Sequence, residues 1–228
     1  MHNNIISYEN LYDDEIMASL YEVSKHLFMP PSSFFIGFEE YFTNKARKLL
    51  SEYFPAPFVE FLYDHLNTII VKTNIIRDGR YGFEIWIGNS SSKSKTSGYL
   101  HVDNDEFYRM KYNITKTPIW GSILYITPKN TMVGGETIVL NENPDNLLLF
   151  TTYEKNFLLD IPNSFVCEPV TGKLLLFRGD LPHAVLPFNL RNARDTRINL
   201  MVNIWEERIF SVPEGITFFN KDSNGCNH

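Results

Sequence analysis

A histidine and an aspartate, both common metal ligands, lie two residues apart in "GYLHVDNDEFY". On a β-strand, residues at i and i+2 point to the same face, so His101 and Asp103 can reach one ion. A metal held by these two needs a further ligand, and of the six histidines only His183, in "GKLLLFRGDLPHAVLPF", has a comparable setting. Two imidazoles and one carboxylate form a facial triad, which leaves coordination positions open and suits non-haem Fe(II). The pattern predicts an iron site.

An arginine stands at the start of the last apolar segment, "DTRINLMVNIW". A buried guanidinium without a partner is very costly, and the sequence offers Arg197 no obvious acidic neighbour on the same face. The carboxylate of a ligand would match its planar fork. Arg194 is the rival anchor, but its setting, "RNARD", is typical of a solvated turn. We therefore expect Arg197 to bind an anionic ligand.

The elements that must position these side chains differ between the two parts of the chain. Residues 9–67 have apolar side chains at helical spacing, as in "DDEIMASLYEVSKHLF" and "GFEEYFTNKARKLLSEYF". From Thr68 onward the period changes to two, and short segments rich in β-branched and aromatic residues predict strands: "TIIVKTNII", "YGFEIWIG", "WGSILYIT", "ETIVL", "NLLLFTT", "KLLLF" and "RINLMVNIW". Many short strands without intervening helices favour a mainly β fold with N-terminal helices, a double-stranded β-helix of the jelly-roll, cupin-like kind.

We expect one domain over residues 1–228. A helical support over 1–67 would precede a jelly-roll core over 68–210 and a C-terminal tail over 211–228. The polar stretch "NSSSKSKTSG" just before His101 is typical of a flexible loop, which could close over the site as a lid.

Composition excludes several classes of protein. The net charge of −6 and the lack of a basic stripe argue against a nucleic-acid partner. No apolar run approaches the roughly 18 residues of a membrane span, and the first residues lack the layout of a signal peptide. The two cysteines, Cys167 and Cys226, make a disulfide framework improbable. A soluble, cytoplasmic protein is expected.

Four segments, "LHVDN", "LYIT…GGETIVL", "GKLLLFRGDLPHAV" and "RINL", follow one another in the order typical of a known superfamily. The sequence resembles the Fe(II)/2-oxoglutarate-dependent oxygenases over roughly residues 98–206, and the prolyl-4-hydroxylase-like branch among them. The resemblance implies that His101, Asp103 and His183 hold Fe(II). It also implies that 2-oxoglutarate binds the iron while Arg197 pairs with its far carboxylate, assisted by Tyr125.

The activity implied by the resemblance is a 2-oxoglutarate-dependent dioxygenase reaction. Such an enzyme uses O2 to hydroxylate an unactivated C–H bond of an amino acid, a peptide or a natural-product intermediate, and releases succinate and CO2. Two alternatives remain from the residues alone: a cupin-like metal enzyme that does not use 2-oxoglutarate, and a non-catalytic jelly-roll binding module. Arg197 is the feature that separates the 2-oxoglutarate-dependent enzyme from both alternatives, because only that enzyme needs an anchor for the carboxylate of 2-oxoglutarate.

Two further acids follow the predicted ligands directly. Asp105 and Glu106 stand in "NDEFYR", at what would be the rim of the iron site. A carboxylate there could pair with an ammonium or guanidinium group and hold a substrate near the iron. We therefore expect a small-molecule or peptide substrate carrying a basic group, held by Asp105 or Glu106. The competing interpretation is a solvated acidic turn.

Overall fold

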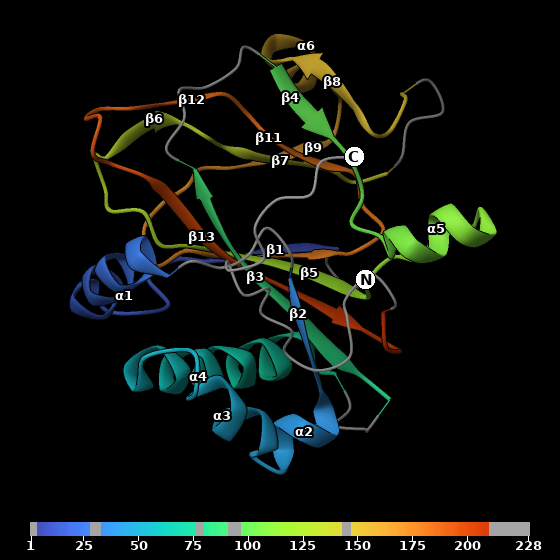
Figure 1. The fold of residues 1–228 in the computed structure, drawn as a ribbon. Helices are drawn as coiled ribbons and strands as arrows, with labels where there is room; N and C mark the ends of the chain where they lie inside the picture. Colours follow the sequence, from blue (N-terminus) through green and yellow to red (C-terminus); the bar gives the residue numbers. More distant parts are fainter. Residues whose placement is uncertain (1–3, 28–32, 76–79, 91–96, 143–146, 210–228) are drawn as a thin grey trace, which may run out of the picture.

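The computed structural model describes residues 4–27, 33–75, 80–90, 97–142 and 147–209, which form two facing layers of antiparallel strands with helices against one of them (Figure 1). The tail expected over 211–228, Cys226 and most of the expected lid, residues 91–96, lie outside the described residues. The helices are α1 (Asp14–His26), α2 (Phe38–Phe42), α3 (Lys45–Leu50), α4 (Ala56–Thr73), α5 (Glu106–Tyr112) and α6 (Lys155–Leu159).

The larger layer is a six-stranded antiparallel sheet in the order β1-β10-β5-β13-β3-β2. Its strands are β1 (Ile5–Tyr8), β2 (Phe34–Gly37), β3 (Gly82–Ser90), β5 (Trp120–Tyr125), β10 (Leu174–Arg178) and β13 (Arg197–Trp205). Figure 1 shows α2, α3 and α4 on the side of this sheet that faces away from the smaller layer.

The smaller layer consists of three short pieces, β11-β7-β9, β12-β6 and β4-β8. Its strands are β4 (Ser97–Leu100), β6 (Met132–Gly134), β7 (Thr137–Leu140), β8 (Thr151–Glu154), β9 (Ser164–Cys167), β11 (His183–Val185) and β12 (Phe188–Leu190). Apolar residues from both layers pack between them: Ile123, Leu175 and Phe177 from the large sheet meet Val139 and Cys167 from the small one. The predicted jelly-roll fold is confirmed.

Strand β13 has two different faces, and this difference positions the site. Its even residues, Ile198, Leu200, Val202 and Ile204, are fully buried in the core that the large sheet forms with α4. Because side chains alternate along a strand, its odd residues point into the space between the two layers. Those residues are Arg197, Asn199, Met201, Asn203 and Trp205.

The strand predicted over "TIIVKTNII" is wrong, because α4 continues through Thr73. Leu62, Leu66 and Ile69 continue the helical spacing of apolar residues into that segment, and all three are fully buried. Asn74 ends the helix in the left-handed conformation, with φ of 52°. The β-branched composition favoured a strand, but the packing of the apolar face against the sheet decides for a helix.

The N-terminal part is not only helical. β1 pairs with β10, and β2 pairs with β3, so residues before Thr68 supply both edge strands of the large sheet. The helix expected over "GFEEYFTNKARKLLSEYF", residues 37–54, is interrupted at Asn44, which has φ of 58°. The N-terminal segment is thus built into the β-fold as well as supporting it.

His65 of α4 is buried in the core, where the Tyr12 hydroxyl lies 2.9 Å from its Nδ1. Burial lowers the pKa of His65 to about 3. Its ordinary value of about 6.5 applies in the unfolded chain. Below pH 6.5 the unfolded chain therefore takes up a proton that the folded protein does not, so His65 destabilises the fold progressively as the pH falls.

We expect His65→Gln to make stability less sensitive to acid. Between pH 7 and pH 5.5 the wild type should lose on the order of 1 kcal/mol of unfolding free energy more than the variant, because the variant has no group at this position to protonate. Urea unfolding of both proteins at the two pH values measures the difference. Equal losses would show that His65 does not stay neutral in the fold.

Candidate metal centre

His101 and His183 are joined to each other by their backbones. His101 follows the last residue of β4 and His183 begins β11, and each backbone N–H donates to the carbonyl of the other, at 3.0 and 2.8 Å. In an antiparallel pair, residues bonded in this way carry their side chains on the same face. The two imidazole rings accordingly lie with their centroids 4.4 Å apart.

Asp103 completes a cluster with the two histidines. Its Oδ1 lies 3.7 Å from Nε2 of His101, and its Oδ2 lies 3.8 Å from Nε2 of His183. One potential ligand atom from each of the three residues lies within 4.8 Å of the others. The structure thus brings together the three residues that the sequence predicted, with two nitrogen donors and one oxygen donor facing a common centre.

The outer nitrogen of each imidazole is held by the backbone. Nδ1 of His101 lies 3.1 Å from the carbonyl of Tyr99, and Nδ1 of His183 lies 3.1 Å from the carbonyl of Leu181. Because a carbonyl only accepts, Nδ1 is the donor in both contacts, which leaves Nε2 of each ring directed toward Asp103. Burial lowers the pKa of His183 to about 4, partly offset by Asp103, so the ring is neutral at pH 7. Neutral imidazole is the form that binds a metal.

Asp103 also has a partner that the sequence did not single out. Asn203 of β13 donates from Nδ2 to Oδ2 of Asp103 at 3.0 Å, and the same nitrogen lies 3.5 Å from Oε2 of Glu84 on β3. Burial raises the pKa of Glu84 above its ordinary value. A polar residue at an inward position of a mostly apolar strand is the signal that could have identified Asn203.

Arg197 lies at the other end of the inward face of β13 and is 8% exposed. No carboxylate in the described part of the chain forms an ion pair with it, and its Nε has no hydrogen-bond partner there. One guanidinium nitrogen donates to the Gly135 carbonyl at 3.5 Å. When the side-chain amide of Asn199 is turned so that its oxygen faces the guanidinium, this oxygen accepts hydrogen bonds from both terminal nitrogens of Arg197, at 2.8 and 2.9 Å. Burial lowers the pKa of Arg197.

Tyr125 is buried beside this guanidinium, and its hydroxyl donates to Oγ1 of Thr137 at 2.7 Å. Burial raises the pKa of Tyr125 well above its ordinary value, whereas the charge of Arg197 acts in the opposite direction. The phenol is therefore protonated at pH 7. Tyr125 pairs with Asn199 in the β5–β13 register, which places it next to the buried arginine.

Strand β7 and the residues just before it connect the two ends of the site. Gly135 contacts Arg197, Thr137 contacts Tyr125, and Val139 pairs with His183. At a rise of about 3.3 Å per residue, the backbone from Gly135 to Val139 spans roughly 13 Å. Arg197 and the histidine–aspartate cluster thus lie toward opposite ends of the same short segment of the small layer.

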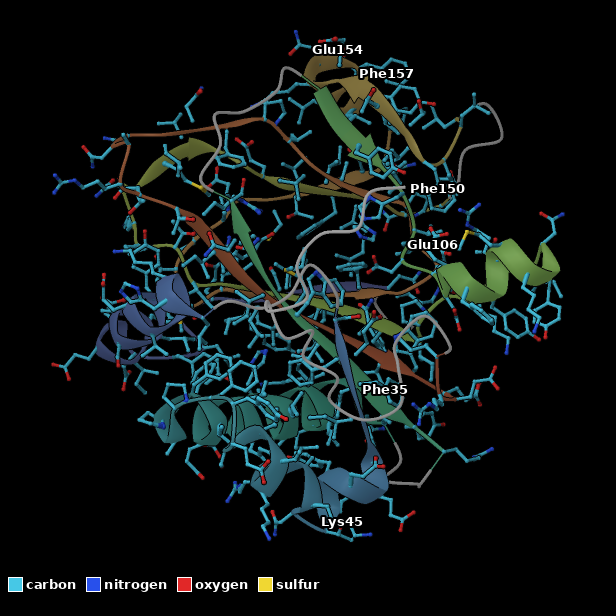
Figure 2. The ribbon with its side chains drawn as sticks, viewed as in Figure 1. Phe35, Lys45, Glu106, Phe150, Glu154 and Phe157 are labelled. Atoms are coloured by element: carbon cyan, nitrogen blue, oxygen red, sulfur yellow. The ribbon has the colours of Figure 1, made fainter. Side chains whose placement is uncertain are left out.

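The other charged residues considered from the sequence lie in different settings. Arg194 is exposed in the turn before β13. Asp105 is 2% exposed and caps α5, where it accepts from the backbone N–H of Tyr108 at 3.1 Å. Glu106, at the start of α5 (Figure 2), accepts from Nε and a terminal nitrogen of Arg109 at 2.9 and 2.6 Å. Both acids therefore have partners within the chain.

No protein-family model matches the sequence, and no curated protein sequence matches it. The fold, however, is similar to solved structures. A prolyl-4-hydroxylase from Pseudomonas putida matches 91% of this chain and 87% of its own at 14% identity and a TM-score of 0.52. HygX from Streptomyces hygroscopicus, solved with nickel and 2-oxoglutarate bound, matches 89% of this chain and 81% of its own at 11% identity and a TM-score of 0.50.

EvdO2 from Micromonospora carbonacea var. aurantiaca matches 89% of this chain and 86% of its own at 12% identity and a TM-score of 0.50. At such identities the similarity establishes the fold. The fold implied by the resemblance that the motifs carry is therefore confirmed. In the described ranges, no helix is long and apolar enough to cross a membrane.

We expect His101→Ala and His183→Ala each to abolish binding of Co(II) at concentrations that saturate the wild type, because each removes one nitrogen donor from the cluster. The fold should persist, since the two positions are joined through their backbones and not through their side chains. Co(II) titration followed by visible absorption, with circular dichroism of each variant, measures both effects. His26→Ala, on the exposed face of α1, is the control. Wild-type Co(II) affinity in both site variants would contradict the ligand assignment.

Proposed function

We propose that this protein is an Fe(II)- and 2-oxoglutarate-dependent dioxygenase that hydroxylates an unactivated C–H bond. The observation that carries the proposal is the buried guanidinium of Arg197, which has no carboxylate partner in the described chain and faces the same space as the histidine–aspartate cluster. A buried cation of this kind is stabilised by an anion that arrives with the ligand. The fold supports the proposal, because HygX, which shares it, was solved with 2-oxoglutarate bound.

The residues present fit the metal and the co-substrate. His101, Asp103 and His183 would hold Fe(II) through two nitrogens and one oxygen, a donor set that suits this ion and leaves positions open. When bound, Fe(II) and 2-oxoglutarate would supply the activation of O2 needed to hydroxylate the substrate C–H bond, with conversion of 2-oxoglutarate to succinate and CO2. The cupin-like and non-catalytic alternatives would leave the burial of Arg197 without a function.

The protein would position the co-substrate and exclude water. Arg197 would pair its planar fork with the far carboxylate of 2-oxoglutarate, and Asn199 fixes the orientation of that fork. The protonated phenol of Tyr125, which donates its one hydrogen to Thr137, could turn that hydrogen to the same carboxylate when the co-substrate is bound. Ile123 and Met201, on the inward face of the large sheet, make the space between the layers apolar, which strengthens the ion pair.

We propose that residues 1–228 act as one domain. The support is the pairing of β1 with β10 and of β2 with β3, which places N-terminal residues in the same sheet as β13. The site therefore depends on the whole described chain. The cytoplasmic location stays a prediction.

The test of the reaction class is conversion of 2-oxoglutarate to succinate by the purified protein with Fe(II), screened against amino acids, peptides and natural-product intermediates. Succinate release that depends on Fe(II) and increases with a substrate supports the proposal. Metal binding without any 2-oxoglutarate binding would instead favour a cupin-like enzyme that does not use it. Absence of metal binding would favour the remaining alternative, a non-catalytic jelly-roll binding module.

Arg197→Ala should weaken 2-oxoglutarate affinity by about 2–4 kcal/mol, the scale for removing one partner of a buried charge pair. Arg194→Ala is the matched control, because this arginine lies nearby in the chain but is exposed. Calorimetric titration of 2-oxoglutarate into the Co(II)-loaded proteins measures both. The anchor is wrongly assigned if Arg194→Ala weakens binding and Arg197→Ala does not.

A basic group on the substrate, held by Glu106 or Asp105, stays a prediction. Glu106 is the more available of the two, since Asp105 is buried in its cap, but a cationic substrate would have to compete with Arg109. Glu106→Gln should then weaken the affinity for such a substrate by about 1–3 kcal/mol and leave 2-oxoglutarate affinity unchanged. Arg109→Gln, the matched variant, should strengthen substrate binding. Unchanged substrate affinity in both variants would reject the contact.

A further inference from the structure

Asn203 lies between two carboxylates. It is 2% exposed, and its Nδ2 lies 3.0 Å from Oδ2 of Asp103 and 3.5 Å from Oε2 of Glu84. An amide nitrogen has two hydrogens and can donate one to each carboxylate. The side chain therefore joins a residue of the metal-binding cluster to a buried acid on the neighbouring strand.

Glu84 is itself fixed by two other donors. Nε1 of Trp205 donates to its Oε2 at 3.0 Å, and the hydroxyl of Ser33 donates to its Oε1 at 2.5 Å. Asn203 and Glu84 are direct partners in the β13–β3 register, so their side chains stand on the same face of the sheet. The amide is thus held by sheet pairing and by an acid that cannot turn away without losing its own hydrogen bonds.

The contact restricts how Asp103 can use its two oxygens. A hydrogen bond from Asn203 occupies part of Oδ2, which lies 3.8 Å from Nε2 of His183, whereas Oδ1 lies 3.7 Å from Nε2 of His101 and accepts no hydrogen bond from the described residues. A carboxylate that binds a metal through both oxygens takes up one more coordination position than a carboxylate that binds through one. Holding Oδ2 therefore favours one-oxygen binding and keeps a position open for the co-substrates.

We propose that Asn203, backed by Glu84, is a positioning residue that holds Asp103 in its ligating orientation and limits it to one oxygen. This inference rests on the proposed function, because it requires Asp103 to be a metal ligand. Partners in the second layer around a metal orient its ligands, and losing one typically costs about 10–100-fold in metal affinity. A residue that only fills space in the core would have no such effect.

The test uses Co(II) as the probe and compares the wild type with Asn203→Ala and Asn203→Asp. We expect Co(II) affinity to fall about tenfold or more in Asn203→Ala, with a changed visible absorption spectrum as Asp103 changes its binding mode. Asn203→Asp keeps the shape of the side chain but replaces the donor by a third carboxylate. It should alter the spectrum as well, and its Co(II) affinity should differ from that of the wild type.

Ser122→Ala is the control for loss of a buried hydrogen bond. Ser122 is buried on the adjacent strand β5 and donates to the Val202 carbonyl at 2.7 Å, away from the cluster. This variant should unfold at a lower urea concentration yet bind Co(II) with the affinity and spectrum of the wild type. Urea unfolding of every metal-free variant separates loss of stability from loss of metal binding.

Each outcome decides between defined alternatives. If the wild type does not bind Co(II), the proposed function fails before this inference is tested. If the wild type binds and Asn203→Asp matches its affinity and spectrum, Asn203 only fills space and the inference is wrong, even if Asn203→Ala does not fold. If Asn203→Ala loses affinity and both Asn203 variants change the spectrum while Ser122→Ala does neither, the positioning role is supported.

The part assigned to Glu84 needs a double-mutant cycle. If Glu84 acts by fixing Asn203, Glu84→Gln should weaken Co(II) binding in the wild type but have little further effect in Asn203→Ala. Fully additive losses would show that Glu84 acts on the metal through its charge alone. That result would overturn the role proposed for Glu84 but would not affect the positioning role proposed for Asn203.

Discussion

The paired backbone hydrogen bonds between His101 and His183 are the contact on which the site depends. They join the end of β4 to the start of β11, two strands from distant parts of the chain, at one cross-strand position. This pairing alone sets both imidazoles on one face with their centroids 4.4 Å apart. Because the link is made by the backbone, the geometry of the two nitrogen donors is set by the fold of the small layer, before any metal is bound.

Strand β13 makes the complementary contribution from the large sheet. Its outer face packs against α4 as apolar core, which supplies the burial that holds the strand in place. Its inner face carries the buried polar residues Asn199 and Asn203 toward the small layer, where Asn203 bonds to Asp103 and Asn199 bonds to Arg197. Arg197 is only partly satisfied, because no carboxylate of the described residues pairs with its charge and its Nε has no hydrogen-bond partner among them. Buried polar groups left partly unsatisfied are often found in ligand sites.

The N-terminal part of the chain supports the large sheet and is connected to the site through other residues. α4 covers the outer face of β13, and β1 and β2 close the two edges of the large sheet. Ser33, just before β2, donates to Glu84 and so connects the N-terminal segment to the residues around Asp103. The helical support expected from the sequence is therefore continuous with the β-fold, and the histidine–aspartate cluster lies on the other side of the large sheet from α4.

The sequence by itself determined which residues form the cluster and which class of fold carries them. Both depend on residue type and on the alternation of apolar and polar side chains, which can be read directly from the sequence. His101, Asp103 and His183 were identified from spacing and setting, and Arg197 from a charge at the start of an apolar strand. What only the tertiary structure decided are contacts that depend on pairing across the chain: the register of His101 with His183, the partner of Asp103, and the role of Asp105 as a helix cap. The same holds for "TIIVKTNII", whose β-branched residues favour a strand locally but whose burial against the large sheet continues α4 through Thr73, since packing outweighs intrinsic propensity.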